Sequence, residues 1–306
     1  MSEYVISCGS CADIDKAHFQ KRNIKYICFH YFLDEKEYID DLGESMPLSD
    51  FYQAMVDGAM THTSQINVQE YIDFFEQFLK AGKDIIHITL GSGISGTYNS
   101  ALLAKEQLDE KYPDRKLYVI DSLGASAGIG LLVDRMADLR FTGMDIDALA
   151  GWVERHKLEV NHWFFSSDLT FYIRGGRISK TAGMIGNALN ICPFLNVDHE
   201  GKLIVRDKIR TKKKAMRAMV KKMAALAENG TAYNKSCYIS HSACYDDARA
   251  VANMIEETFP KLKGHVEIYD IGTTIGSHTG PGTIALFFWG EKRVDQKKVS
   301  DAVTDQ

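Results

Sequence analysis

The chain has 306 residues, of which 45% are hydrophobic and 25% charged, and its net charge is −5 at pH 7. This composition is that of an ordinary globular protein and excludes the disordered and fibrous classes. An acidic balance also excludes a global basic field, so no nucleic-acid partner is expected. The amino terminus lacks a leader pattern and no long uncharged apolar run occurs, so the sequence predicts a cytoplasmic protein.

The first half of the chain alternates short apolar runs with longer segments of helical period. Strands are predicted at 4–7, 26–32, 85–90 and 116–121, helices at about 14–22, 49–58, 68–81, 96–110, 125–139 and 144–160, and a turn at 61–65. Strands that are apolar on both faces and separated by helices indicate a mainly parallel sheet covered on both sides. We therefore predict an N-terminal three-layer α/β/α domain over residues 1–160.

The second half has a different rhythm. Strands are predicted at 162–167, 202–209, 236–242, 265–271 and 283–289, and helices at 212–228 and 245–258. This order predicts a C-terminal α/β domain with a mixed sheet over residues 161–306, and a cleft between the two domains. From residue 291 onward the sequence is polar and is expected to be a frayed tail.

Three glycines follow the predicted strand at 85–90. Gly91, Gly93 and Gly96 satisfy G-x-G-x-x-G between a strand and a helix, a pattern typical of an NAD(P)-dependent oxidoreductase. However, the next strand ends at Asp121, later than the acidic residue that binds the ribose would be expected. A strand-to-helix turn that needs glycine and an anion site built from amides and the hydroxyl of Ser95 are the other interpretations.

Cysteine and histidine spacings suggest two further chemistries. Cys8 and Cys11 form C-x-x-C after a strand, as in thiol oxidoreductases, although the two-domain length fits that small fold poorly. Cys237, His241 and Cys244 have the residue types of a zinc site, but alternation along a strand points neighbouring side chains to opposite faces. We expect no metal site, and we expect packing roles for these residues.

His278 lies in a segment from which bulky side chains are absent. Gly276, Gly280 and Gly282 flank it and would let another molecule approach closely. A loop histidine that is satisfied by the backbone is the structural alternative. The glycine neighbours favour a ligand contact.

Six motifs occur in order along nearly the whole chain. They are TSQ (63–65), SGISGTYNSA (92–101), DSLGASAGIG (121–130), IRGGRIS (173–179), KIRTKKKA (208–215) and IGSHTGPGT (275–283). In this order and at these intervals they resemble the DegV family of fatty-acid-binding proteins. The family usually has an Asp-Ser pair after the first strand, where this chain has Cys8-Gly9.

The resemblance implies a two-domain α/β protein that holds one long-chain fatty acid between its domains. It implies that the protein is no enzyme and needs no cofactor, and that it presents the carboxylate to the catalytic subunit of a fatty acid kinase, which makes an acyl phosphate for phospholipid synthesis. The motifs place the carboxylate contacts on Thr63, Ser95, Gly96, His278 and Thr279. They also imply that Arg177 and Arg210 face the kinase or the phosphoryl group.

Two structural alternatives accompany these expectations. Thr63 and Ser95 precede predicted helices, so both could cap helix N-termini. The segment 206–222 holds nine Lys or Arg residues and one Asp. It is either a solvated helix face or a docking surface for something anionic, such as the kinase subunit, nucleotide phosphates or, transiently, a membrane surface.

Overall fold

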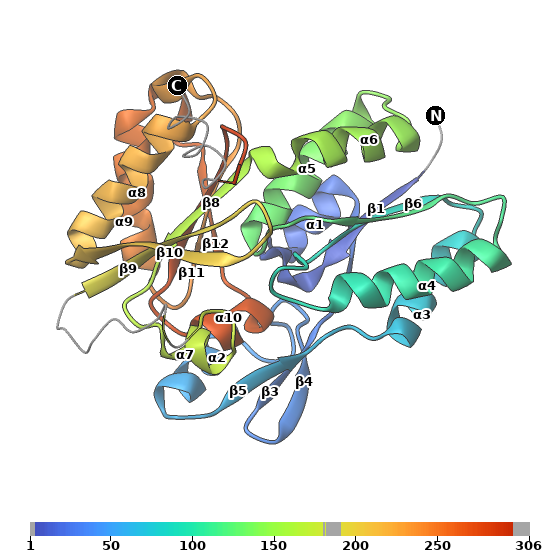
Figure 1. Cartoon of the computed structure of the whole chain (residues 1–306), viewed down its shortest axis with the longest axis horizontal. Coiled ribbons are helices and arrows are strands. Elements are labelled where there is room, and N and C mark those ends of the chain that lie inside the picture. Colours follow the sequence, from blue (N-terminus) through green and yellow to red (C-terminus); the bar gives the residue numbers. More distant parts are fainter. Residues whose placement is uncertain (1–3, 180, 182–190, 296–306) are drawn as a thin grey trace, which may run out of the picture.

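The N-terminal part of the molecule is built on a parallel four-stranded sheet (Figure 1). The computed structural model describes residues 4–179, 181 and 191–295. Strand order is β2-β1-β6-β7, from Ile24–Ile27, Val5–Gly9, Ile85–Thr89 and Leu117–Asp121. Every residue of β1 and β6 is buried. The apolar runs that predicted these strands therefore reflect a sheet covered on both faces.

Helices form the layers on either side of this sheet, as predicted (Figure 1). α3 (Val68–Lys80) and α4 (Thr97–Lys111) pack together on one face, and α5 (Ala127–Phe141) and α6 (Ile146–His156) lie on the other, with α1 (Lys16–Arg22) beside β2. The start of α3 is fixed by a capping box, in which Asn67 accepts from the Glu70 amide and the Glu70 side chain accepts from the Asn67 amide.

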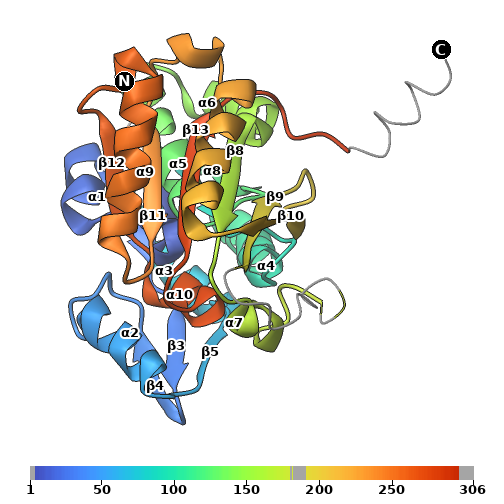
Figure 2. The same cartoon turned by 90° about the vertical axis from the view of Figure 1, so that its left-hand side faces the viewer.

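A small antiparallel sheet, which the sequence did not predict, projects from the parallel one. Its order is β4-β3-β5, from Lys36–Ile39, His30–Leu33 and Thr61–Ser64, with α2 (Leu48–Val56) packed against it (Figure 2). The prediction of one strand at 26–32 is wrong, because the chain leaves the parallel sheet at Cys28 and Phe29. The prediction of a turn at 61–65 is also wrong. In both places hydrophobicity and local residue types do not show which partner strand is available.

The C-terminal part holds a mixed six-stranded sheet in the order β10-β9-β8-β13-β11-β12. Only the β11–β12 pair is parallel among its described ladders. The strands are β8 (Val160–Phe165), β9 (Ile191–Val197), β10 (Leu203–Arg210), β11 (Cys237–His241), β12 (Val266–Asp270) and β13 (Ile284–Trp289), and the helices are α7 (Thr170–Arg174), α8 (Lys212–Leu226), α9 (Tyr245–Thr258) and α10 (Thr273–Thr279). The mixed sheet confirms the predicted class of this part.

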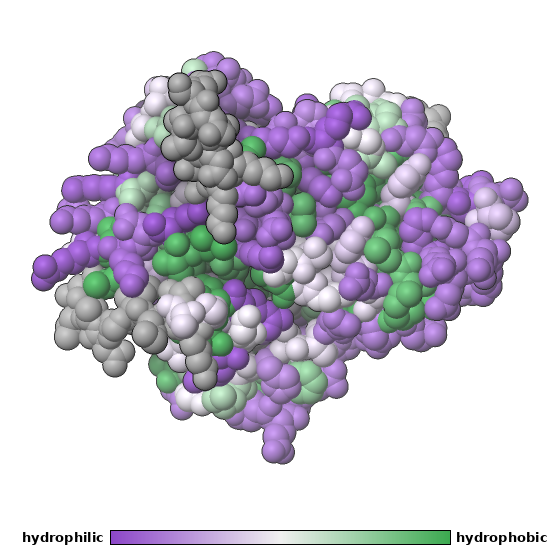
Figure 3. All heavy atoms as spheres, viewed as in Figure 1, coloured by the Kyte–Doolittle hydropathy of each residue, from purple (hydrophilic) through white to green (hydrophobic). Residues whose placement is uncertain are grey.

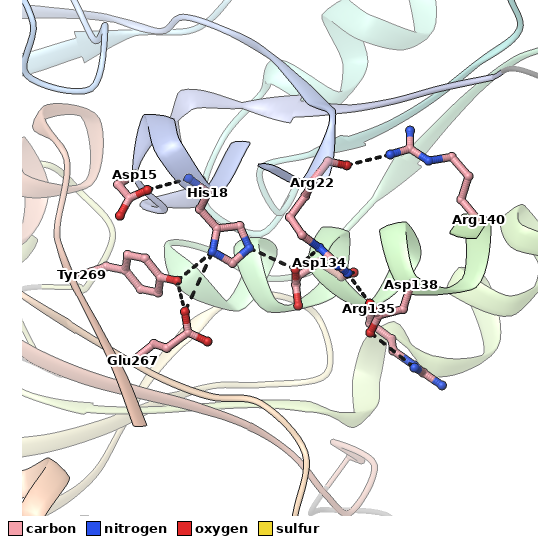
Figure 4. A network of polar contacts seen from close by, with 9 residues as sticks. All are labelled: Asp15, His18, Arg22, Asp134, Arg135, Asp138, Arg140, Glu267 and Tyr269. Carbon is pink, nitrogen blue, oxygen red and sulfur yellow. Dashed lines mark hydrogen bonds and ion pairs between the residues drawn. The ribbon is translucent and has the colours of Figure 1, made fainter. Parts of the chain in front are cut away.

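Helix α5 connects the two parts of the fold. It packs on β1 of the parallel sheet and on β8, β11 and β13 of the mixed sheet. A polar network at its outer side joins α1, α5 and β12 (Figure 4). In it, His18 lies 2.9 Å from Asp134 Oδ1 through Nε2 and 2.9 Å from the Tyr269 hydroxyl through Nδ1, while Arg22 pairs with Asp134. These contacts fix the parallel sheet against the mixed one.

The segment after β13 is not a frayed tail where the structure describes it. Arg293 is 8% exposed, and its Nη1 donates to the carbonyls of Leu123 and Asp198 at 2.8 and 2.7 Å. The prediction of a frayed tail from residue 291 is therefore wrong as far as Arg293. A polar sequence gave no sign that one of its cations would be buried. The rest of the predicted tail, 296–306, lies outside the described residues.

Candidate ligand-binding site

A cavity of about 240 Å³ lies where the two parts meet. It is larger than the roughly 150 Å³ apolar cavity that admits benzene in an engineered protein. Its apolar lining is formed by Phe29, Leu90, Ile94, Ala125, Phe164, Tyr172, Val197, Leu203, Ile271, Ile275, Ala285 and Phe287. Figure 3 shows hydrophobic side chains gathered in a hollow near the middle of this face. Such a space suits an elongated apolar molecule.

Thr63 and His278 form the polar centre of the cavity wall. Thr63 comes from β5 and His278 from the last turn of α10, and Thr63 Oγ1 lies 2.7 Å from His278 Nε2. α10 is placed against β5 by a second bond, from the Thr61 hydroxyl to the Ser277 carbonyl. No helix was predicted around His278, but the segment folds as a short helix that begins after Gly272 and ends at Gly280, where φ is +67°.

The His278 ring is held neutral by its surroundings. Burial, with the charge of Arg177 second, lowers its pKa to about 3. Its Nδ1 is buried without a hydrogen-bond partner among the described residues. This atom faces Gly175, and a Cβ at Gly175 would overlap it. Glycine is therefore required at position 175 if the ring is to keep this position.

Ser95 and Gly96 lie at the beginning of α4 and also line the cavity. The Ser95 hydroxyl accepts from the Thr97 amide at 3.3 Å, so the capping hypothesis fits Ser95 in part. It is wrong for Thr63, which is in a strand, while Asn67 caps the following helix. Gln65 was not singled out from the sequence, although it belongs to the TSQ motif. A Cβ at Gly96 would lie 2.3 Å from its side-chain oxygen, so Gln65 would have to move if residue 96 had a side chain.

Thr279 and Arg177 complete the polar lining near His278. Thr279 Oγ1 is buried and has no partner among the described residues. Arg177 donates from Nε to the Ile94 carbonyl at 3.2 Å and from Nη1 to the Gly175 carbonyl at 2.5 Å. Burial lowers the pKa of its guanidinium, which no carboxylate faces at these two contacts. Arg177 thus brings a positive charge to the cavity that no acidic residue among the described ones pairs with.

Arg210 does not join this group. It is the last residue of β10, it is exposed, and it is not among the residues that line the cavity. The structure therefore brings together Thr63, Ser95, Gly96, His278, Thr279 and Arg177 from the predicted set. It leaves Arg210 on the surface, next to the basic helix α8 that follows it in the chain.

The buried carboxyl groups behind the cavity wall were not predicted from the sequence. Ser126 and Thr274 line the cavity, and their hydroxyls donate to the carboxylates of Asp13 and Asp40. Burial raises the pKa of both acids, that of Asp13 well above its ordinary value. Ser126 also has φ 56° and ψ −150°, a strained combination for a residue with a side chain. The position of Ser126 inside the DSLGASAGIG motif was the only signal for this cluster.

The glycine-rich loop gives no support to a nicotinamide site. A Cβ at Gly91 would lie 2.8 Å from the Gly124 amide nitrogen, and one at Gly93 would lie 2.5 Å from the Glu200 carbonyl oxygen. The glycines thus permit close packing of this loop against the 121–126 loop and the β9–β10 turn. The Ser92 amide is already bonded to Asp121, the residue considered for a ribose. The close approach that Gly91 and Gly93 permit is thus made by the backbone of this protein itself.

The two cysteines of the C-x-x-C sequence are packed in the core. Cys8 and Cys11 are fully buried, and burial raises the pKa of both thiols, which makes them poor nucleophiles. A Cβ at Gly9 would lie 2.6 Å from the Phe29 ring, so glycine after Cys8 allows that ring to pack. Within residues 4–179, 181 and 191–295, no group of three His, Cys, Asp or Glu side chains could hold a metal ion.

Comparison with known proteins identifies the family. The family model described as an uncharacterised protein of the DegV family matches residues 5–291. A DegV domain-containing protein of Clostridium perfringens is 37% identical over 293 residues, which cover 96% of this chain and 99% of the relative. This chain belongs to the DegV family. The six motifs quoted above therefore marked the family correctly.

Solved structures of DegV proteins share this fold. A fatty acid binding DegV family protein from Streptococcus agalactiae has a TM-score of 0.80 at 26% identity, covering 95% of this chain and 100% of that one. The fatty acid kinase B3 protein of Streptococcus pneumoniae, loaded with linoleic acid, has a TM-score of 0.81 at 21% identity, covering the same shares. Among the helices that the structure describes, none combines the length and apolar character needed to cross a bilayer.

Proposed function

We propose that this DegV protein binds one long-chain fatty acid, with the acyl chain in the cavity and the carboxylate at Thr63 and His278. The observation that carries the proposal is the combination of an apolar cavity with one polar cluster in its wall. The Streptococcus agalactiae relative, which is described as fatty acid binding, supports the same ligand class. In this proposal the protein is a lipid-binding accessory protein and catalyses no reaction by itself.

The acyl chain supplies most of the affinity in this proposal. Each buried methylene contributes about 0.8 kcal/mol, so a chain of about 15 methylenes contributes roughly 12 kcal/mol before the cost of association. One hydrogen bond to a charged group contributes only about 1.5–3 kcal/mol. The head-group cluster therefore serves mainly to orient the ligand. The aliphatic and aromatic residues of the wall hold it in place.

Two hydrogen bonds in series, from His278 to Thr63 and from Thr63 to the ligand, would hold the carboxylate. A carboxylate only accepts hydrogen bonds, so Thr63 would donate its hydroxyl proton to the ligand and accept the Nε2 proton of His278. This assigns the neutral Nε2–H tautomer to His278, in agreement with its pKa of about 3. Ser95 and the unpartnered hydroxyl of Thr279 would supply further donors. Both ligand oxygens would then be satisfied, as burial of a carboxylate requires.

We further propose that a fatty acid kinase subunit phosphorylates the bound ligand. Neutral donors orient the carboxylate without a full ion pair, so its oxygens keep the nucleophilicity needed to attack a phosphorus atom. Arg177 lies at the same end of the cavity and would bind the negative charge of the transferred phosphoryl group. Arg210, which is exposed, would contact the kinase subunit itself.

Solvent extraction of the purified protein followed by mass spectrometry tests the ligand. We expect one fatty acid of about C14 to C20 per chain, because the acyl chain dominates the affinity. Protein from which no lipid is extracted, and which takes up none when delipidated and mixed with oleic acid, would contradict the proposal. Bound NAD would revive the oxidoreductase alternative.

Reconstitution with a fatty acid kinase catalytic subunit and ATP tests the partnership. We expect acyl phosphate from the wild type and at least a tenfold loss of its formation in Arg177→Ala, with oleate binding retained. Arg174→Ala is a matched control, since Arg174 is exposed on α7 and lies outside the cavity lining. Normal lipid binding without acyl phosphate would refute the kinase role alone.

A further inference from the structure

A second hollow lies at the β2 edge of the parallel sheet. It has a volume of about 360 Å³ and lies between α1 and α3, beside β2. We call it the β2 groove and define it by Lys16, Phe19, Lys25, Tyr26, Phe74 and Phe78. None of these residues lines the lipid cavity. The groove is therefore separate from the proposed lipid site.

An unpaired strand edge forms the floor of the β2 groove. β2 is the terminal strand of the order β2-β1-β6-β7 and pairs only with β1. Among the described residues, the backbone of Ile24–Ile27 makes no hydrogen bond to any other element. Unpaired amide and carbonyl groups at a strand edge are a template for another extended chain. The main-chain pattern thus selects an extended segment over a helix.

Aromatic side chains form the α3 wall of the β2 groove and part of its floor. Tyr26 of β2 packs on the buried ring of Phe19 with ring centroids 4.7 Å apart, and the centroids of Phe74 and Phe78 on α3 lie 5.5 Å apart. Successive side chains of an added strand point to opposite faces. One wall would therefore receive the odd residues of the strand and the other the even ones. The α3 wall fits apolar side chains, and the α1 wall, which Lys16, Gln20 and Asn23 line, fits polar ones.

The charge of the β2 groove is positive in a chain whose net charge is −5. Its lining contains two lysines and no acidic residue. Lys16 pairs with Glu44 at the surface, whereas Lys25 is exposed and makes no ion pair among the described residues. An incoming strand with a carboxylate beside Lys25 would supply the missing partner. Charge complementarity thus favours an acidic segment.

We propose that the β2 groove binds an extended, acidic and apolar segment of a partner protein, which adds as a fifth strand beside β2. Four residues of β2 at about 3.3 Å each give a floor of roughly 13 Å, enough to pair with four or five residues. Main-chain hydrogen bonds would give affinity, and the aromatic α3 wall with Lys25 would give specificity.

Selection from a displayed library of random heptapeptides tests this proposal, with the purified full-length protein as the target. We expect enrichment of peptides with alternating apolar residues and at least one Asp or Glu. Their binding should weaken at least tenfold in Lys25→Glu and in Gln77→Trp, which fills the groove from α3. Lys213→Glu, the same charge change at an exposed site on α8, should leave the affinity unchanged. Amide hydrogen exchange at 24–27 should slow when the peptide binds.

Other outcomes would overturn the proposal. No enrichment above a naive library, or selected peptides that bind Gln77→Trp as tightly as the wild type, would show that the groove takes no strand. A concentration-dependent dimer that Gln77→Trp abolishes would show that a second copy of this chain occupies the edge. Oleate binding serves as the folding control, and both groove variants should retain it because the groove and the lipid cavity share no residues.

Discussion

Thr63 and His278 are 215 residues apart in the sequence, yet Thr63 Oγ1 and His278 Nε2 lie 2.7 Å apart in the fold. β5 reaches out of the N-terminal part to present the threonine. α10 presents the histidine from between β12 and β13 of the mixed sheet. The pair therefore exists only while the two parts are packed together. A ligand held by both residues would stabilise that packing.

Removal of either member of this pair should weaken lipid binding. We expect Thr63→Val and His278→Ala each to raise the dissociation constant of oleate roughly 10- to 100-fold, because one hydrogen bond to a charged group is worth about 1.5–3 kcal/mol. Displacement of a fluorescent fatty acid would measure the change. His62→Ala is the matched control, since His62 is the exposed neighbour of Thr63 on the same strand. Unchanged affinity in both variants would place the head group elsewhere.

A side chain at position 175 should weaken lipid binding. A Cβ at this position would overlap His278 Nδ1, so Gly175→Ala should displace the imidazole and weaken oleate binding at least tenfold. Circular dichroism should show an unchanged fold. Gly151→Ala in α6 is the control, because a Cβ there meets only the flexible end of Arg155. If Gly175→Ala bound oleate like the wild type, the ring position would not matter for the ligand.

Buried histidines should make the protein acid-sensitive. Burial lowers the pKa of His87 and of His278 from 6.5 to about 3. Between these values the unfolded chain binds protons that the folded chain does not, so the free energy of unfolding falls as the pH falls. Each histidine should account for about 2 kcal/mol between pH 6.5 and 5, at about 1.4 kcal/mol per pH unit.

Urea unfolding at pH 7.5 and pH 5 would measure this dependence. His87→Leu should reduce the difference between the two pH values by about 2 kcal/mol, and His62→Leu, an exposed site, should leave it unchanged. The comparison with the wild type separates His87 from Asp13 and Asp40, whose raised pKa values act in the opposite direction. An equal pH difference in His87→Leu and the wild type would contradict the role given to burial.

Arg293 should contribute strongly to the stability of the junction between the two parts of the fold. Its guanidinium donates to carbonyls of Leu123 and Asp198, which belong to the two parts of the fold. Arg293→Ala would remove both bonds and leave only the Gly201 amide as a donor to the Asp198 carbonyl, so we expect the free energy of unfolding to fall by about 2–4 kcal/mol. Denaturant titration would measure it. Lys292→Ala, at an exposed neighbouring site, should have little effect. A loss below 0.5 kcal/mol would refute this role.

The sequence predicted the longer helices and most strands well because their signal is local, but it missed the short helices α7 and α10 and the strands β4 and β9. The alternation of apolar runs and helical periods gave β1, β6, β7 and α3 to within a few residues. It failed at 26–32, where the chain passes from one sheet to another, and at 61–65, where β5 pairs with β3. Pairing of β3 with β5 joins residues 28 to 34 positions apart, and no local periodicity predicts it.

The candidate site likewise contains residues that the sequence predicted and residues that it did not. Ordered motifs in the sequence marked Thr63, Ser95, Gly96, His278, Thr279 and Arg177, and the fold places all six around one cavity. The same motifs marked Arg210, which the fold leaves exposed. Nothing in the sequence marked Asp13 and Asp40, because an ordinary aspartate in a polar context gives no sign of burial.

By itself the sequence determined the family, the class of the two sheets and the residue types available to a ligand, because these follow from local patterns and ordered motifs. Only the tertiary structure decided that His278 is neutral, that Gly175 makes room for it and that Arg293 is buried. Each of these properties arises from atoms brought together from distant segments. Desolvation and close contact exist only after the two sheets have packed on α5.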